Sequence, residues 1–421
     1  MLGNIRHLLL GLLLPLSAVQ AQIVVDVSGA QQRARPIAIL PVQGDPGVRM
    51  DYIISSDLHK TGLFQPISPD SFPMRPDSPA SIDFAAFSGI GADYVVLGRM
   101  LGAADGQFTL SQVGDQALLA NEQIGDRDAR MVAHKAADMI LEKLTGQRGA
   151  FATSIAYVLE QDRGNARHYA LLVSDVDGAN RREVFSSNQP IMSPAWSPDG
   201  RQLAYMTYQG NQSQLIVQDL GSGARRVVAQ NDGISSSPAF SPDGRSLVFA
   251  QSTNNNFDIY LLDLGSGTKS RLTDHAAIDT EPAFSPDGNS IYFTSDRSGS
   301  PQIYRMSRRG GGAERAVVGS GYTAGGDLSP DGRSVVMTRQ SGGGYQIGLY
   351  DLGSGRFEAL TNGRLDEGAS FAPNGQLIIY ASREGGQSVL KVINRQGGVA
   401  QTLSDPSGRL RDPAWGPDTR N

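Results

Sequence analysis

The residues of this chain that could do chemistry are scattered rather than gathered into a catalytic motif. Four histidines follow the apolar N-terminal run, and no two of them have the spacing of metal ligands on one helix: His59, His134, His168 and His275. The sequence contains no Cys and no G-x-S-x-G motif, which excludes thiolate sites and the nucleophile elbow of serine hydrolases. We therefore interpret the histidines as surface or capping residues.

Two short segments match ligand-binding loops only in part. Asp175-Val-Asp-Gly178 has the beginning of a calcium loop but lacks its distal Glu, so a hairpin turn is the better interpretation. Gly319-Ser-Gly-Tyr-Thr-Ala324 nominally fits a dinucleotide-binding pattern, but it lies between repeat units rather than between a strand and a helix. We predict no catalytic residue, no metal site and no cofactor, which favours a binding protein over an enzyme.

A repeated phrase sets the architecture that must position any binding site. Pro194-Ala-Trp-Ser-Pro-Asp-Gly200 recurs in recognisable form, with the proline of its turn at positions 198, 242, 286, 330, 373 and 417. The steps are 44, 44, 44, 43 and 44 residues. Apolar and β-branched runs separated by Gly-rich turns follow each copy and predict four strands per unit. A period of this length with several short strands per unit is typical of a β-propeller.

The ends of the repeat array predict how the propeller closes. Three strand-like segments precede the first phrase, at 155–159, 169–173 and 182–185, and they lack a first strand. The last phrase, Pro413–Asp418, lacks the other three strands. If the two partial units form one sheet, the count is six complete blades with no unpaired inner edge. An open stack of β-units is the alternative.

The segment before the repeats predicts a second domain of mixed α/β structure. Ile37–Leu40 and Tyr94–Gly98 are short buried strands, and Phe108–Val113 with Ala117–Gln123 suggests a hairpin. Asp45-Pro46 could begin one helix, and Asp126 could cap another whose apolar face runs from Val132 to Leu144. We expect an α+β domain with a mixed sheet over 22–146, a linker at 147–153 and an all-β six-bladed propeller over 154–421.

The N-terminus and the charge balance indicate the compartment and exclude one class of partner. An apolar run from Leu8 to Ala18, followed by Val19-Gln-Ala21, is typical of a secretory signal peptide over 1–21 and is too short to span a bilayer. The net charge is −5 with both signs interspersed, so no basic surface for nucleic acid is indicated. We expect a secreted, periplasmic monomer that does not insert into a membrane.

The same residues resemble the TolB family of periplasmic propeller proteins, which belongs to the Tol–Pal envelope system. The resemblance rests on Ser56–Phe64, Gly91–Gly98, Glu142–Phe151, Ile155–Tyr157 and Met192–Gly200, and it covers about residues 22 to 418. It implies an adaptor that binds two proteins and supports outer-membrane integrity and constriction during cell division. One partner would be a Pal-type outer-membrane lipoprotein that is associated with peptidoglycan, and the other a TolA-type inner-membrane protein.

The resemblance also implies where each partner binds. The TolA-type protein would take the mature N-terminal segment 22–35, at Gln22, Ile23, Val24, Val25, Asp26, Val27 and Ser28. The Pal-type lipoprotein would dock on the loops entering the first strand of each blade, at Met192, Ser193, Ile234, Ser237, Thr280, Glu281 and Glu367. The alternative functions are a propeller hydrolase or lyase that uses the central channel, and a scaffold that binds metal or sugar.

Overall fold

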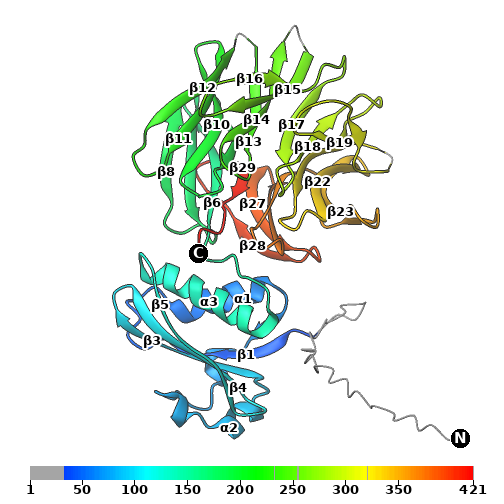
Figure 1. The fold of residues 1–421 in the computed structure, drawn as a ribbon. Coiled ribbons are helices and arrows are strands. Elements are labelled where there is room, and N and C mark those ends of the chain that lie inside the picture. The colour runs from blue at the N-terminus through cyan, green and yellow to red at the C-terminus, as the bar shows by residue number, and fades with distance from the viewer. Residues whose placement is uncertain (1–32, 232, 254–255, 320, 421) are drawn as a thin grey trace, which may run out of the picture. The chain divides into compact units, whose positions relative to one another are not determined.

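A computed structural model describes residues 33–231, 233–253, 256–319 and 321–420 (Figure 1). The predicted signal peptide and the predicted partner-binding residues 22–28 lie outside these ranges. From Ala34 onward the chain forms a single compact unit that contains two structural domains. Within the described ranges, no helix has the length and apolar character needed to cross a membrane.

The first domain is a five-stranded mixed sheet with helices. The strand order is β2-β1-β3-β4-β5, with β1 parallel to both of its neighbours and the remaining pairs antiparallel. The strands are β1 (Arg35–Ile39), β2 (Phe64–Pro66), β3 (Tyr94–Gly102), β4 (Asp105–Gln112) and β5 (Ala117–Gly125). The helices are α1 (Met50–Lys60), α2 (Phe84–Gly89) and α3 (Ala129–Thr145).

Alternate residues of β1 face two different layers, as the two-residue period of a strand requires. Ile37 and Ile39 belong to the core that includes residues of α1 and α3, whereas Ala38 belongs to the core that includes Phe87 of α2. Figure 1 shows α1 and α3 together on one face of the sheet and α2 on the other.

The structure corrects two predicted helix starts. The first helix begins at Met50 rather than directly after Asp45-Pro46, although the Asp45 carboxylate still accepts the Met50 backbone N–H at 3.1 Å. The helix predicted to follow Asp126 is α3, and it is capped by Asp128, whose side chain accepts the Met131 backbone N–H, and not by Asp126. Asp126 instead pairs with Lys135 at 2.6 Å.

The second domain is a six-bladed β-propeller, which confirms the predicted fold class. Five blades are sheets of four consecutive strands, and their first strands are β9 (Met192–Trp196), β13 (Ser235–Phe240), β17 (Asp279–Phe284), β21 (Thr323–Leu328) and β25 (Asp366–Phe371). The second strands are β10 (Gln202–Gln209), β14 (Ser246–Thr253), β18 (Ser290–Ser295), β22 (Ser334–Ser341) and β26 (Leu377–Glu384). The third strands are β11 (Gln212–Asp219), β15 (Asn256–Asp263), β19 (Gln302–Ser307), β23 (Gly344–Asp351) and β27 (Gln387–Asn394). The fourth strands are β12 (Arg225–Asn231), β16 (Lys269–Arg271), β20 (Glu314–Arg315), β24 (Phe357–Ala359) and β28 (Val399–Leu403).

The sixth blade closes the ring by joining the two ends of the repeat array. Its strand order is β29-β6-β7-β8, in which β29 (Arg409–Trp415) pairs antiparallel with β6 (Ser154–Arg163). The other strands are β7 (Ala166–Asp175) and β8 (Arg182–Ser187). The indole N–H of Trp415 donates to the Thr153 hydroxyl at 2.9 Å, and that of Trp196 donates to the Ala414 carbonyl at 3.1 Å. These bonds tie the sixth blade to the linker and to the first blade.

Candidate functional site

A ring of left-handed residues surrounds one end of the propeller channel. Each first strand contains an irregularity at which the pairing register shifts, and one residue of each takes a positive φ there. These six residues have φ between 49° and 63°: Ser193, Ser237, Glu281, Gly325, Gly368 and Asp412. Such bulges turn the backbone and re-aim the neighbouring side chains. We call this set the mouth ring.

Two carboxylates of the mouth ring join neighbouring blades. The Glu281 carboxylate accepts the backbone N–H of Gly325 at 2.7 Å and the Thr294 hydroxyl at 2.8 Å. The Asp412 carboxylate accepts the backbone N–H of Ser193 at 3.4 Å, across the closure of the ring. Each carboxylate therefore bonds to the next blade's residue in the same ring position, which fixes the shape of the mouth.

Apolar side chains that are exposed or partly exposed precede three residues of the mouth ring. Ile234 and Ile278 each stand three residues before a ring residue, and they are 41 % and 47 % exposed. Tyr322 occupies the same position in the fourth blade, where it packs edge-on against Tyr345. Burying aliphatic and aromatic groups next to oriented acceptors is typical of protein interfaces.

The mouth also carries negative charge. Glu367 directly precedes Gly368, and desolvation together with the charges of Asp412 and Glu281 raises its pKa. Burial also raises the pKa of Asp412. Arg411 opposes both shifts, and the repulsion that Asp412 and Glu281 exert on Glu367 would be reduced further by a partner with hydrogen-bond donors or positive charge.

The structure places the residues predicted for the Pal-type partner at this mouth. Met192 and Ser193 begin β9, Ser237 lies in β13, Thr280 and Glu281 lie in β17, and Glu367 lies in β25. Ile234 directly precedes β13. The residues predicted for this partner did not include Ile278, Tyr322 or Asp412, although the loops predicted for this face, 278–281 and 410–412 among them, contain Ile278 and Asp412. The repeat could have found them, because 278 and 322 follow 234 at steps of 44, and Asp412 is the sixth member of the mouth ring.

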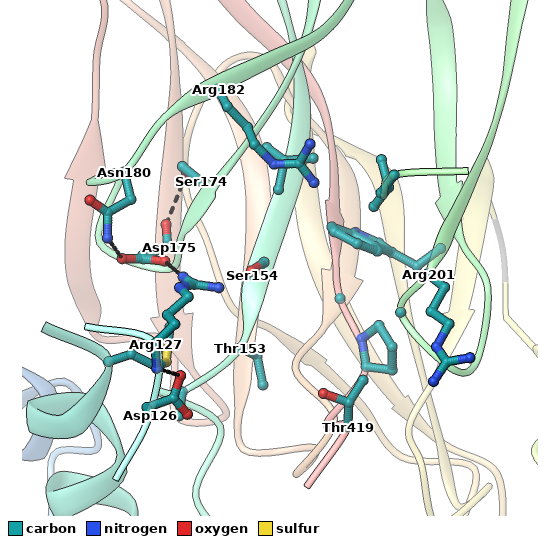
Figure 2. A pocket seen from close by; sticks show the side chains of 18 of the residues that line it. Asp126, Arg127, Thr153, Ser154, Ser174, Asp175, Asn180, Arg182, Arg201 and Thr419 are labelled. Atoms are coloured by element: carbon teal, nitrogen blue, oxygen red, sulfur yellow. Dashed lines mark hydrogen bonds and ion pairs between the residues drawn. The ribbon is translucent and has the colours of Figure 1, made fainter. Parts of the chain in front are cut away.

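The opposite end of the blades, at the Pro-Asp-Gly turns, faces the first domain. A cavity of about 840 Å³ lies between the domains and is lined by Gly200 and Pro417 of these turns and by Arg127, Met131 and Lys135 of the first domain. Figure 2 shows Arg127 reaching Asp175 across this cavity, with Asn180 on the other oxygen of the same carboxylate. The mouth ring is thus at the end of the propeller that the first domain leaves free.

One predicted histidine role is wrong. His59 and His275 are exposed and His168 is partly exposed, but His134 is fully buried and its Nδ1 lies 2.5 Å from an Asp57 oxygen. The prediction failed because Asp57 is 77 residues away and only the packing of α1 against α3 brings the two together. The segment Asp175–Gly178, by contrast, is the predicted hairpin turn, closed by the Gly178 N–H donating to the Asp175 carbonyl.

The donor atoms of His134, Asp175 and Asp177 lie within 4.8 Å of one another, which is close enough to consider a metal. Arg127 pairs with Asp175 at 2.5 Å and Arg130 pairs with Asp177. The two guanidinium groups already neutralise both carboxylates, and a divalent cation would have to displace them. The chemistry of this donor set therefore fits an ion-pair network better than a metal centre.

Comparison with known proteins gives a consistent result over the whole chain. Residues 23–118 match the TolB amino-terminal domain, and residues 141–419 match the TolB beta propeller domain. The chain is 51 % identical to the Tol-Pal system protein TolB of Thioalkalivibrio sulfidiphilus, covering 97 % of each chain. It is 52 % identical to the protein of that name in Methylococcus capsulatus, covering 96 % of this chain and 97 % of the relative.

A solved structure supports the same relationship. The crystal structure of TolB from Acinetobacter baumannii superimposes with a TM-score of 0.85 and 35 % sequence identity, covering 93 % of this chain and 98 % of that one.

Proposed function

This chain belongs to the TolB family of Tol-Pal system proteins, and from that premise we propose that it is a periplasmic adaptor between two envelope proteins. One partner is a Pal-type, peptidoglycan-associated lipoprotein of the outer membrane, and the other is a TolA-type protein of the inner membrane. By linking them, the protein supports outer-membrane integrity and constriction during cell division.

The observation that carries the proposal is the preformed mouth ring. Hydrogen bonds between blades hold the carboxylates of Glu281 and Asp412 in place before any partner arrives, and the exposed Ile234 and Ile278 lie three residues before ring residues. A preorganised surface loses little conformational entropy on binding, which favours a specific protein contact. We assign the Pal-type lipoprotein to this surface, with Ile234 and Ile278 as apolar anchors and Ser237, Thr280, Glu281 and Glu367 around them.

The second contact is assigned to the N-terminal segment, residues 22–35. Its β-branched residues Ile23, Val24, Val25 and Val27 suit an extended strand that adds to the sheet edge of a TolA-type partner. The segment leads directly into β1, whose first residue Arg35 donates a backbone N–H to the Leu63 carbonyl at 2.9 Å. A partner that held this segment would therefore be connected directly to the central sheet of the first domain.

We propose binding rather than catalysis because two of the carboxylates at the mouth, Glu281 and Asp412, already have structural partners. A hydrolase or lyase at the channel would need an acid and a base free to contact substrate. Glu281 and Asp412 instead accept backbone N–H groups of the neighbouring blades.

A pull-down from envelope extracts with the mature protein tests the proposal. Recovery of both a lipoprotein of the outer membrane and an inner-membrane Tol component, identified by mass spectrometry, is the expected result. Recovery of neither, together with turnover of an ester, glycoside or peptide substrate that one substitution at the mouth abolishes, would replace the adaptor with an enzyme.

A further inference from the structure

One side of the beginning of α3 contacts a single turn of the propeller through charged groups. Arg130 and His134 are four residues apart on one face of α3, and Arg127 directly precedes the Asp128 cap of this helix. All three face the turn between β7 and β8. Arg127 pairs with Asp175 at 2.5 Å, Arg130 pairs with Asp177, and His134 Nε2 lies 3.7 Å from an Asp177 oxygen.

His134 differs from its two neighbours because its charge depends on pH. The side chain is fully buried, and its Nδ1 is 2.5 Å from one oxygen of Asp57 on α1. The other oxygen of Asp57 accepts from Lys60 at 2.9 Å. Nε2 has no hydrogen-bond partner among the described residues, and the Asp177 carboxylate of the propeller is the charged group facing it.

The two protonation states of His134 interact with the propeller in opposite ways. In the neutral ring, Nδ1–H donates to Asp57 and the Nε2 lone pair faces the Asp177 carboxylate, which is repulsive. In the protonated ring, both nitrogens carry hydrogen and the imidazolium lies between carboxylates of the two domains. The 3.7 Å gap is longer than a hydrogen bond and closes by a small movement of the turn.

The charges around His134 favour a proton over a metal ion between His134 Nε2 and the Asp177 carboxylate. Asp57, Asp128, Asp175 and Asp177 contribute four negative charges, and Lys60, Arg127 and Arg130 contribute three positive charges, so the group becomes neutral when His134 is protonated. Asp138 lies one turn further along α3 and is paired with Arg420. A single proton adds one charge directly between two carboxylates, whereas a divalent ion adds two and competes with both guanidinium groups.

We propose that His134 is a proton-sensitive latch between the first domain and the propeller, tightened by protonation and loosened by deprotonation. The latch goes beyond the adaptor function and does not depend on it.

The direction of the pH effect follows from the surroundings of His134. Burial opposes the charged ring, but the carboxylates of Asp57 and Asp177 outweigh it and raise the pKa of His134 above 6.5. Asp57 lies in the same domain as His134, so only the part of the shift that Asp177 causes acts between the domains. A group whose pKa is raised by docking contributes its full stabilisation below its pKa in the undocked state. That contribution is lost as the pH rises through the raised value. The docked arrangement is therefore strongest in mildly acidic conditions and weakest in alkaline ones.

The latch can be tested on the mature full-length protein by nuclear magnetic resonance of the His134 ring and by amide hydrogen exchange. In Asp177→Asn the imidazole keeps Asp57 but loses the propeller carboxylate, so its pKa should fall by about half a unit or more. Protection of the amides in the β7–β8 turn, corrected for intrinsic exchange rates, should decrease by about threefold or more between pH 6 and pH 8.5. His134→Gln should remove that dependence, and the exposed-site control His275→Gln should retain it.

Three results would overturn the proposal. The first is an unchanged His134 pKa in Asp177→Asn, which can be read even if His134→Gln fails to fold. The second is turn protection with the same pH dependence in His134→Gln as in the parent. The third is a rise in melting temperature on adding Zn²⁺ that His134→Gln abolishes, because it would assign the gap to a metal ion instead of a proton.

Discussion

The Glu281 carboxylate accepts the backbone N–H of Gly325 at 2.7 Å, and the two residues hold the same position in neighbouring blades. The contact spans 44 residues of sequence, which is one repeat. It joins two left-handed bulges, so the side chain of one blade fixes the backbone of the next. The shape of the mouth thus depends on bonds between blades as well as on the sheets themselves.

Replacing Glu281 by Ala should destabilise the propeller by about 1–3 kcal/mol, because the Thr294 hydroxyl loses its acceptor and the Gly325 N–H keeps only its longer bond to Thr294 Oγ1 at 3.1 Å. Glu281→Gln keeps an acceptor and should cost less. Urea unfolding measures the free energy of unfolding of both variants. Glu314→Ala, at an exposed position in the same blade, is the matched control. Equal stability of Glu281→Ala and the parent protein would show that the bond contributes nothing.

Ile234→Asp and Ile278→Asp should each weaken binding of a Pal-type lipoprotein by about tenfold or more, because each places a charge where an apolar anchor should be buried. Both side chains are exposed in the free protein, so the melting temperature should hardly change. Calorimetric titration and thermal unfolding check the two expectations. Leu118→Asp, at an exposed position in the first domain, should bind like the parent. Undiminished binding by both isoleucine variants would place the contact elsewhere.

A chain that starts at Ala34 should fold, bind the lipoprotein and lose the TolA-type partner. Keeping Arg35 matters, since its backbone N–H bonds to the Leu63 carbonyl and its guanidinium donates to the Leu144 carbonyl at 3.2 Å. A chain that starts at Pro36 should therefore melt at a lower temperature. Surface-immobilised partners and thermal unfolding provide the measurements. Full binding of the inner-membrane partner by the chain that starts at Ala34 would rule out residues 22–33 as the binding site of that partner.

Asp327→Asn should flatten the pH dependence of stability between about pH 4 and pH 6. Burial raises the pKa of Asp327 to about 6, although its carboxylate accepts the Phe371 backbone N–H at 2.8 Å. The folded protein therefore holds this proton more tightly than the unfolded chain, and the parent loses that stabilisation as the pH rises through about 6.

Thermal unfolding of parent and variant across this range checks the prediction for Asp327. The melting temperature of Asp327→Asn relative to the parent should be higher at pH 7.5 than at pH 4. Asp115→Asn, at an exposed turn, should show no such change. A constant difference between Asp327→Asn and the parent would mean that the carboxyl does not titrate in this range.

The repeat and the closure of the propeller could be predicted from the sequence because both depend on local chemistry. The Pro-Asp-Gly turn sets the chain reversal within a few residues, and Gly200, Gly244 and Gly288 have the positive φ that this turn needs. A spacing of 44 residues then repeats the blade, and the two partial units at the ends can only complete one another.

The first residue of α3 could not be predicted from local chemistry, because the sequence has two acidic residues there that could cap the helix, Asp126 and Asp128. The choice between them depends on contacts with distant parts of the chain. Asp126 pairs with Lys135, while Arg127 extends to Asp175 of the propeller. The helix therefore begins where its first turn can satisfy both the cap and the domain contact.

The sequence by itself determined the two-domain plan, the six blades and the end of the propeller to which the predicted Pal-type residues belong. Only the tertiary structure decided that His134 is buried between Asp57 and Asp177, and that Glu281 and Asp412 bond to neighbouring blades. Turn chemistry and strand period act over a few residues and leave a signal in the sequence. The partner of a buried charge is set by which elements pack together, and residues 77 or 219 positions apart leave no local signal of that contact.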